Sequence, residues 1–345
     1  MSKTPKLRVV LYGVGAVGSL IARELLRRKG VEIVGAVDVA REKVGKDLGD
    51  IIGVGKRLGI AVSNDIDSVL SKVGADIVVH ATSSFLRDVY PQIAEILKKG
   101  VSVVSTCEEL SYPYATDPRI AEEIDRLARE HNVTVLGTGI NPGFLMDTLV
   151  IVLTGVCQDI DRIEVKRVMN AATRRAPFQK KIGAGLTLEE FKEKIRRKVI
   201  TGHVGLEQSI AMTADALGWK LSIKVNPVEP IIAKNRIESE AVKVEPGYVA
   251  GLRQTAIGTK EREPVIILDF QAYVGVEEEY DSITIDGTPE IHEKISPCIH
   301  GDIGTVAIIV NSIPKVLNAP PGLMTMKDLP IPSASIEDVR TYIRR

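Results

Sequence analysis

The sequence lacks the features that mark several specialised classes of protein. Its 45 lysine and arginine residues are balanced by 45 aspartate and glutamate residues, so no broad electrostatic field would attract nucleic acid or an anionic membrane surface. No run approaches the roughly 18 consecutive apolar residues of a membrane-spanning helix, and the first residues have no apolar segment typical of a signal peptide. We therefore expect a cytoplasmic protein with no nucleic-acid or membrane partner.

Cysteine is also scarce. The three cysteines, Cys107, Cys157 and Cys298, are odd in number and far apart, and they fit neither the ligand spacing of a zinc site nor a disulfide framework. We therefore expect no metal site. The 345 residues, 44% of them hydrophobic, are enough to fill the cores of two domains.

Three glycines near the start of the sequence have the spacing of a nucleotide-binding turn. An apolar strand, Leu7–Tyr12, leads into the turn Gly13-Val-Gly15-Ala-Val-Gly18, and a helix follows. The first glycine permits a tight turn, the second leaves room for a pyrophosphate against the backbone, and the third lets the helix pack close to the strand. A second strand, Glu32–Val37, ends at Asp38, whose carboxylate would accept hydrogen bonds from the adenosine ribose. This order predicts a dinucleotide-binding site.

The choice between NAD and NADP depends on a few charges after the second strand. Asp38 would repel the 2′-phosphate of NADP, which favours NAD. Arg41 and Lys43 follow closely and could pair with that phosphate, or they could be solvated charges on a loop. We expect NAD as the cofactor, with NADP tolerated.

Strand and helix patterns alternate through the first 140 residues, which is typical of parallel βαβ units. Further strands are predicted at Ala75–Val79, Ser102–Ser105 and Thr134–Gly137. An apolar run that begins at Gly304 predicts a buried helix near the end of the chain. We therefore predict an α/β protein with an N-terminal Rossmann domain over residues 1–140, to which residues 302–345 return.

After residue 140 the strand patterns group together instead of alternating with helices. Strands are predicted at Arg162–Val168 and Pro264–Tyr273, and helices at Leu188–Ile195 and Leu206–Leu217. This grouping indicates an α+β second domain with a mixed sheet over residues 141–301, which would bind substrate. If one face of that sheet is apolar, it would be buried against a symmetry mate, so we expect a homodimer.

Polar segments follow two of the predicted strands, where the nicotinamide end of the cofactor would lie. The hydroxyls and amides of His80–Ser84 could hold the nicotinamide ribose, or they could begin a capped helix. Glu108 and Glu109 follow the next strand, and two adjacent carboxylates are costly to bury unless they are paired or used. One of them could stabilise an iminium cation and take protons from water or ammonia, or the pair could begin a helix.

Twelve residues are predicted to contact the dinucleotide. They are Gly13, Gly15, Ala16, Val17, Gly18, Asp38, Arg41, Ala81, Thr82, Ser83, Thr106 and Asn141.

Longer motifs extend over nearly the whole chain. Besides the glycine turn they are Ser105-Thr-Cys-Glu-Glu-Leu-Ser-Tyr-Pro113, Gly137-Thr-Gly-Ile-Asn-Pro-Gly-Phe-Leu-Met-Asp147, Arg174-Arg-Ala-Pro-Phe-Gln-Lys-Lys-Ile-Gly-Ala-Gly185, Gly202-His-Val-Gly-Leu-Glu207, Gly301-Asp-Ile-Gly-Thr305 and Ala319-Pro-Pro-Gly-Leu-Met-Thr-Met. In these motifs the chain resembles the 2,4-diaminopentanoate dehydrogenases and related amine dehydrogenases, which belong to the wider dihydrodipicolinate-reductase-like group.

The resemblance implies a small-molecule reaction. An amine such as 2,4-diaminopentanoate would be oxidised by NAD or NADP to a ketone and ammonia, or the ketone would undergo the reverse reductive amination. The resemblance places the catalytic carboxylate in the Glu108-Glu109 pair. We favour Glu109, because it is nearer the turn at Tyr112 and Pro113, and keep Glu108 as the second choice.

Four residues are candidates for substrate binding. Arg174 and Arg175 could bind an amino-acid carboxylate in bidentate fashion, or they could be surface charges. His203 could contact substrate or cap a helix, and His300 could face the site or a domain boundary.

Two other functions remain open. One is a cyclic-imine reductase of the dihydrodipicolinate reductase type, although the sequence has no His-His-rich substrate loop like the one associated with that enzyme. The other is a non-catalytic dinucleotide-binding protein whose carboxylates are structural. A requirement for free ammonia would separate amine dehydrogenation from cyclic-imine reduction.

Overall fold

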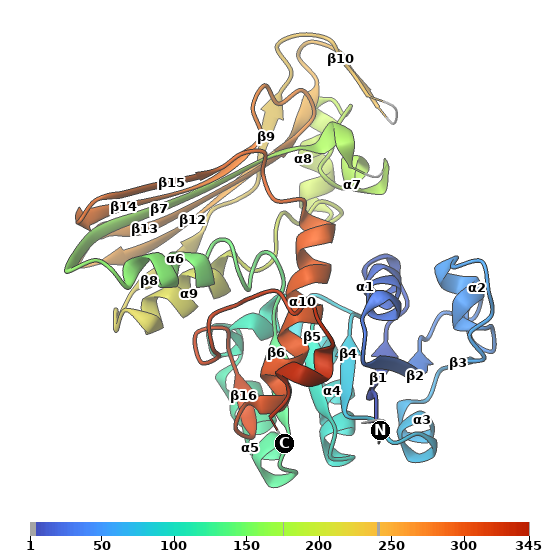
Figure 1. Ribbon diagram of the computed structural model, residues 1–345. Coiled ribbons are helices and arrows are strands. Elements are labelled where there is room, and N and C mark those ends of the chain that lie inside the picture. The colour runs from blue at the N-terminus through green and yellow to red at the C-terminus, as the bar shows by residue number, and fades with distance from the viewer. Residues whose placement is uncertain (1–4, 175, 240–241, 345) are drawn as a thin grey trace. The chain divides into compact units, whose positions relative to one another are not determined.

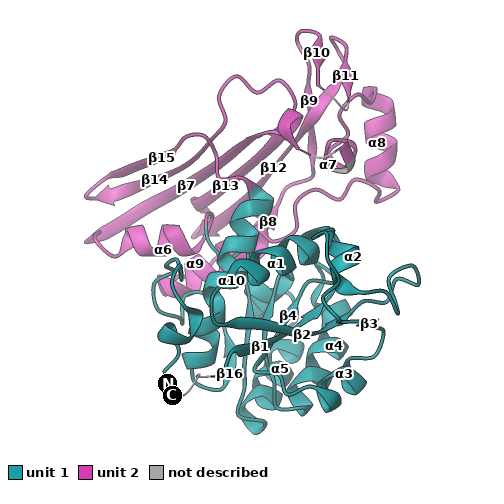
Figure 2. Ribbon diagram, turned by 45° about the vertical axis from the view of Figure 1, so that its right-hand side comes forward, with its two compact units in different colours: residues 1–144, 301–345 teal, residues 145–300 magenta. Residues whose placement is uncertain are grey.

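A computed structural model describes residues 5–174, 176–239 and 242–344. The chain forms two compact units, one of residues 1–144 and 301–345 and the other of residues 145–300 (Figure 2). No helix in the described ranges is both long and apolar enough to cross a membrane.

The first unit contains a seven-stranded parallel sheet with strand order β16-β6-β5-β4-β1-β2-β3 (Figure 1). Its strands are β1 (Leu7–Tyr12), β2 (Val31–Val37), β3 (Val62–Ser63), β4 (Ile77–His80), β5 (Ser102–Ser105), β6 (Thr134–Gly137) and β16 (Gly322–Met324). The strand order reverses between β1 and β4. In open α/β sheets, ligands bind outside the carboxyl ends of the strands at such a reversal.

Helices cover this sheet. They are α1 (Ala16–Arg27), α2 (Leu48–Ile52), α3 (Ile66–Lys72), α4 (Leu86–Lys98), α5 (Pro118–Glu130) and α10 (Gly301–Asn318), together with the short 3₁₀ turns η1 (Glu109–Ser111), η2 (Pro113–Ala115) and η4 (Val339–Tyr342). Every residue of β4, β5 and β6 is buried, as expected for parallel strands with helices on both faces.

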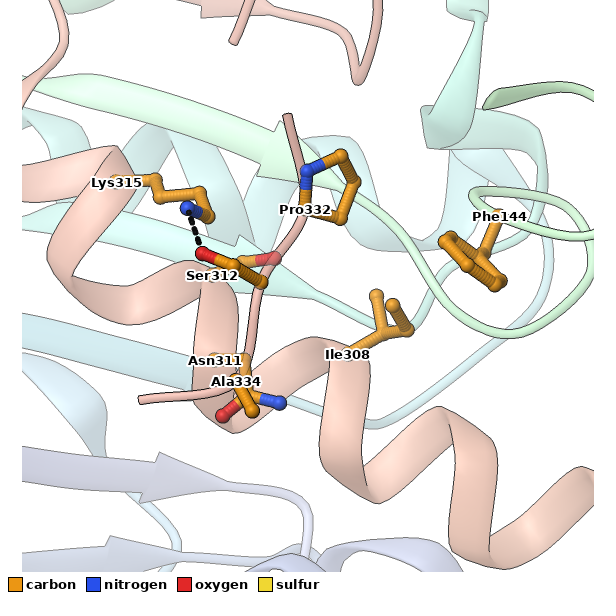
Figure 3. Close-up of a pocket in the computed structure, with 8 residues that line it drawn as sticks. Phe144, Ile308, Asn311, Ser312, Lys315, Pro332 and Ala334 are labelled. Carbon is orange, nitrogen blue, oxygen red and sulfur yellow. Dashed lines mark hydrogen bonds between the residues drawn. The ribbon is translucent and has the colours of Figure 1, made fainter. Parts of the chain in front are cut away.

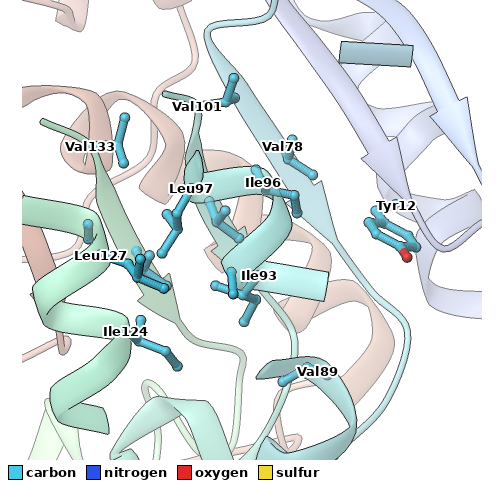
Figure 4. Packing of buried hydrophobic residues seen from close by; sticks show 14 of the residues in the cluster. Tyr12, Val78, Val89, Ile93, Ile96, Leu97, Val101, Ile124, Leu127 and Val133 are labelled. Atoms are coloured by element: carbon cyan, nitrogen blue, oxygen red, sulfur yellow. The ribbon is translucent and has the colours of Figure 1, made fainter. Parts of the chain in front are cut away.

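The main core lies where the apolar stripes of α4 and α5 meet the sheet. Ile93, Ile96 and Leu97 of α4 and Ile124 and Leu127 of α5 pack there (Figure 4). The apolar residues recur at helical spacing, so each helix presents one apolar face to the strands. The helix predicted from Gly304 is present as α10, which packs against α1, β5 and β6.

The second unit contains a mixed sheet with strand order β15-β14-β7-β13-β12-β8, in which β9 also pairs with β12. The strands β7 and β13 run parallel to each other, and the other described pairs in this sheet are antiparallel. The strands are β7 (Asp159–Asn170), β8 (Ser222–Val225), β9 (Glu229–Ile232), β12 (Val249–Lys260), β13 (Glu263–Tyr273), β14 (Tyr280–Thr288) and β15 (Ile291–Ile295).

The remaining elements of this unit are helices and a small hairpin. They are α6 (Thr148–Thr154), η3 (Ala171–Thr173), α7 (Ala176–Lys181), α8 (Leu188–Arg196), α9 (Leu206–Ala216), β10 (Ile237–Glu238) and β11 (Lys243–Val244). The Rossmann sheet and the mixed second sheet confirm the predicted fold class.

The apolar face of the second sheet is covered within the unit by α9, which packs on β12 and β13 (Figure 1). A Cβ added to Gly258 of β12 would lie 2.9 Å from Ile210 of α9, which shows that this face of the strand meets the helix. The opposite face carries polar side chains, among them Glu164 and Lys166, whose charged atoms are 3.0 Å apart. The face that meets α9 is therefore covered within the unit, and the homodimer and its interface stay predictions.

Candidate functional site

The glycine turn after β1 has the shape that its sequence predicts. Gly13 has a φ of +97°, and a Cβ at this position would clash with the carbonyl oxygen of Ala81, while a Cβ on Gly18 would clash with the carbonyl oxygen of Gly13. Packing therefore requires both residues to be glycine. A Cβ on Gly15 would meet nothing within 4 Å, so the space beside the middle glycine is open.

The N-terminus of α1 borders this open space. Gly15 is the N-cap residue and provides no side-chain hydrogen bond, and no acidic residue lies in the first turn. The first intrahelical bond runs from the Ser19 N–H to the Gly15 oxygen, at 2.9 Å. The N–H groups of Ala16, Val17 and Gly18 thus lie in the uncapped first turn, where a helix binds phosphate. The turn fits the pyrophosphate of a dinucleotide.

Asp38 lies just beyond β2 and is held against the glycine turn. Its Oδ2 accepts a hydrogen bond from the Val14 N–H at 2.8 Å and another from Lys43 Nζ at 2.8 Å, while its Oδ1 accepts from the Ala40 N–H at 2.9 Å. Burial acts to raise the pKa of Asp38, but these hydrogen bonds outweigh it and keep the pKa below its usual value. The carboxylate is therefore charged and paired with Lys43, whereas Arg41 is exposed.

The predicted cofactor residues of neighbouring strands come together because the strand ends are in register. Tyr12, His80 and Ser105 are the last residues of β1, β4 and β5, and each is paired with the next across the sheet. The chain therefore leaves the sheet along one edge at Gly13, Ala81 and Thr106. Asn141 follows β6, whose last residue is paired with Ser105.

The hydroxyl groups of the loop after β4 have protein partners. Thr82 Oγ1 donates to Gln92 Oε1 at 2.8 Å, and Ser83 Oγ donates to Asp88 Oδ2 at 2.8 Å while accepting from the Phe85 N–H at 3.3 Å. Ser83 thus stabilises the turn that leads into α4.

The two adjacent glutamates have different surroundings. Glu109 Oε2 accepts a hydrogen bond from the Leu86 N–H at 2.7 Å, and this bond caps α4, whose own N-cap residue provides no side-chain bond. The helix dipole of α4 favours a negative charge there. Glu108 is half-buried, and its backbone oxygen accepts from Ser111 Oγ at 2.7 Å. Glu109 therefore has a structural role, the cap of a helix that precedes the pair in the chain, and not of a helix that the pair begins.

The second unit contains a polar row that the sequence analysis missed. Gln254, Phe270, Arg167 and Asp281 are paired in register across β12, β13, β7 and β14, so they lie on one face of the sheet. Arg167 Nη1 is 2.9 Å from Asp281 Oδ1, and each residue is only 1% exposed. The signal was present in the sequence. With a period of two, Arg167 shares the face of Ile163 and Val165.

His203 joins the same row. Its ring stacks on Phe270 with centroids 4.4 Å apart and an angle of 6° between the planes. The backbone N–H of His203 donates to Gln254 Oε1 at 2.8 Å. Burial and the nearby positive charges of Arg167 and Lys181 lower the pKa of His203 to about 3. The imidazole is therefore neutral at physiological pH.

The other predicted substrate residues are more scattered. The guanidinium of Arg174 lies 4.9 Å from the centroid of the Phe178 ring, a cation–π contact. His300 is half-buried and follows Ile299, whose N–H donates to Asp281 at 2.8 Å and whose oxygen accepts from Arg167. Arg175 lies outside the described residues.

Two hollows in the first unit include none of the predicted site residues. One, of about 460 Å³, is lined by α1 from Leu20 onward and by the first turns of α10. The other, of about 160 Å³, lies beside Lys315, which donates to Ser333 Oγ at 3.1 Å (Figure 3). Among the described residues, no group of three or more histidine, cysteine or acidic side chains could hold a metal ion.

Comparisons with known proteins agree with this geometry. Residues 144–345 match the family model of the 2,4-diaminopentanoate dehydrogenase C-terminal domain, and residues 7–110 match that of the dihydrodipicolinate reductase N-terminus. The chain is 39% identical to 2,4-diaminopentanoate dehydrogenase of Acetoanaerobium sticklandii, over 98% of this chain and 97% of that protein. It is 22% identical to an amine dehydrogenase of Streptomyces virginiae, over 94% and 96% of the two chains.

A solved structure extends the comparison to three dimensions. Amine dehydrogenase from Mycobacterium smegmatis superposes with a TM-score of 0.81 and 33% identity, covering 96% of this chain and 98% of that one. Similarity of this extent includes both units. The chain therefore belongs to the 2,4-diaminopentanoate dehydrogenase family of oxidoreductases that act on amines.

Proposed function

We propose that this protein is an NAD(P)-dependent amine dehydrogenase that oxidises a small amine such as 2,4-diaminopentanoate to the ketone and ammonia, and that also catalyses the reverse reductive amination. The observation that carries the proposal is the Glu108-Glu109 pair, which follows β5 at the same sheet edge as the glycine turn. A carboxylate at this edge suits a reaction that passes through a cationic iminium.

When bound, the nicotinamide ring supplies a hydride acceptor for the carbon that bears the amine. The protein's part is to hold charge and move protons. A carboxylate beside that carbon stabilises the iminium as its positive charge develops, then takes a proton from the water that attacks it. The carbinolamine formed in this way loses ammonia to give the ketone.

We assign the proton-carrying role to Glu108 and a positioning role to Glu109, which reverses the preference drawn from the sequence. The Glu109 carboxylate is held by the Leu86 N–H at 2.7 Å and caps α4, so moving a proton onto it would weaken the cap. Glu108 is the N-cap residue of η1, and both glutamates are half-buried.

For the cofactor we propose NAD, with NADP tolerated. The charged carboxylate of Asp38 follows β2, where it suits a ribose with free hydroxyls. Lys43 neutralises part of this charge and so lessens its repulsion of a 2′-phosphate, and the exposed Arg41 offers a further positive charge. The contacts proposed for the pyrophosphate are the backbone groups of the turn from Gly13 to Gly18.

The substrate contacts remain proposals. Arg174, Arg175, His203 and His300 are the candidate residues for the amine substrate. We also propose that residues 145–300 form a homodimer interface. If it includes the sheet face opposite α9, the charged side chains there would make the interface polar. A monomer in light scattering at micromolar concentration would contradict this part of the proposal.

The test is a panel of amines that includes 2,4-diaminopentanoate, assayed with NAD and with NADP by the absorbance of the reduced cofactor. The reverse reaction is measured with the matching ketone, with and without ammonium. Ammonium-dependent oxidation of NADH supports amine dehydrogenation. Turnover of a cyclic imine without ammonium would indicate the reductase alternative. Stoichiometric NADH binding with no turnover of any amine or imine would indicate a binding protein.

A further inference from the structure

His80 is a buried histidine that the proposed reaction does not use. It is the last residue of β4, it is 0% exposed, and both of its ring nitrogens have partners. Nδ1 lies 2.9 Å from Ser105 Oγ on β5, and Nε2 lies 2.7 Å from Gln92 Oε1 on α4. The ring also meets Tyr12 of β1 edge to face, with centroids 5.4 Å apart. One side chain therefore connects three strands and a helix.

The hydrogen bonds around His80 favour one tautomer. The Cys107 N–H donates to Ser105 Oγ at 3.1 Å, and the Ser105 hydroxyl can donate its own hydrogen to His80 Nδ1. His80 then carries its own hydrogen on Nε2 and donates it to Gln92 Oε1, which also accepts from Thr82 Oγ1 at 2.8 Å. In this series of hydrogen-bonded side chains, each donor faces an acceptor of its neighbour. Burial lowers the pKa of His80 to about 4, which keeps the imidazole in the neutral form that the chain requires.

The two ends of this chain lie in the two loops that matter most for the proposed reaction. One end is the backbone of Cys107, directly before Glu108. The other is Thr82, which follows Ala81, the residue whose carbonyl oxygen lies against Gly13. The Glu109 N–H also donates to the Ser84 oxygen, at 3.2 Å, and so joins the same two loops.

We propose that neutral His80 is a positioning residue for the reaction. By holding the loop that carries Glu108 to the loop after β4, it sets where the Glu108 carboxylate stands relative to the nicotinamide. His80 itself touches no reacting atom. This inference rests on the proposed function, since it concerns the placement of the carboxylate named there.

The test uses variants that keep either the hydrogen bond made at Nδ1 or the one made at Nε2. The substitution H80N places an amide oxygen near the position of Nδ1, so it keeps the acceptor for Ser105. The longer amide introduced by H80Q reaches toward the position of Nε2, so it keeps only the bond to Gln92. S105A removes both the partner of His80 and the acceptor of the Cys107 N–H. H292Q serves as the control, because His292 is exposed and its Nε2 lies 2.9 Å from Glu290 on the surface of the second unit.

We expect kcat for amine oxidation to fall by roughly 10- to 100-fold in H80Q and S105A, since a displacement of about 1 Å in a catalytic group has an effect of this order. The KM for the amine and the Kd for NADH should change less than about threefold, because these interactions do not use the Glu108 placement. H80N should retain more of kcat than H80Q does. Equal kcat in H80N, H80Q and H292Q would overturn the proposal, and so would losses that follow thermal stability alone.

A second measurement does not depend on activity. Nitrogen NMR of the labelled histidines should show His80 as the neutral tautomer with hydrogen on Nε2, and amide exchange at Cys107 should be faster in H80Q than in H80N. The tautomer with hydrogen on Nδ1, or unchanged exchange at Cys107, would overturn the positioning role. If the wild-type protein oxidised no amine while these two results held, the proposed function would fail and the connection between the loops would stand.

Discussion

The two units build their polar sites in different ways. In the first unit the candidate residues lie in loops that leave a parallel sheet along one edge, such as Ala81 after β4 and Thr106 after β5. In the second unit the buried polar row lies within strands, where register brings Arg167 and Asp281 side by side. Loop residues offer backbone amides and adjustable side chains to a ligand, whereas residues within strands are held by every ladder bond around them.

The buried groups of the two units also differ in charge. His80 of the first unit is neutral and bonded through both ring nitrogens. Arg167 and Asp281 of the second unit are a buried ion pair, further bonded to the backbone of Ile299. A buried polar network is destabilised when one member loses its partner, and a buried charge that loses its partner is destabilised more strongly.

The largest expected effect is on the reaction. Glu108→Gln keeps the shape of the side chain but removes its charge and basicity, so kcat should fall by roughly 10²- to 10⁴-fold while NADH binding, followed by fluorescence, stays within about threefold. Glu109→Gln is the matched variant. It weakens the cap of α4, so it should lower the free energy of unfolding by roughly 0.5–2 kcal/mol with a smaller loss of kcat. Near-normal kcat in Glu108→Gln would remove Glu108 from the mechanism.

The next effect is on the stability of the second unit. Asp281→Asn leaves the buried Arg167 charge without its counterion, and the free energy of unfolding should fall by about 3–5 kcal/mol in urea titrations. Ser282→Ala, one residue along β14, should change it by less than about 0.5 kcal/mol. The double variant Arg167→Met, Asp281→Leu should be more stable than Asp281→Asn alone. If the double variant were the less stable, the ion pair would be a net source of stability.

Two histidines, the buried His80 and the half-buried His203, predict how stability depends on pH. Their pKa values are lowered to about 4 for His80 and about 3 for His203, so the unfolded chain binds protons that the folded chain does not. Stability is complete above the unfolded histidine pKa, about 6.5, and is lost as the pH falls toward 4. The free energy of unfolding that His80 accounts for, and that is lost by pH 4, is roughly 3 kcal/mol. The free energy of unfolding, measured by urea titration at several pH values between 7 and 4, should therefore fall less steeply with falling pH in H80N than in wild type. An equally steep fall would show that folding does not lower the pKa of His80.

The smallest effect concerns the cofactor. Asp38→Ala removes the proposed ribose acceptor and frees Lys43 from its ion pair, so NAD should bind more weakly by roughly 1–3 kcal/mol while NADP loses less or gains. Adding Lys43→Ala should abolish the advantage of NADP. Equal weakening of both cofactors by Asp38→Ala would mean that the residue serves only the glycine turn through the Val14 N–H.

Local patterns in the sequence determined much of the fold. The strands Leu7–Tyr12 and Ser102–Ser105 lie where the apolar runs predict them, and the strand predicted at Pro264–Tyr273 falls within β13. Gly13 and Gly18 serve the turn that their spacing predicts. These features can be read from the sequence because each depends on residues that are neighbours along the chain. The strands β3 and β16 were missed, because two or three residues carry no periodicity.

Only the tertiary structure decided which side chains are partners. Glu109 caps a helix that begins 23 residues before it, and Asp281 meets Arg167 across 114 residues of chain. The sequence indicated that Glu109 is costly to bury, yet its partner could not be named, and Asp281 was not singled out at all. Periodicity reports the face on which a side chain lies, whereas the group that it meets on that face depends on strand order and register, which are set by packing of the whole unit.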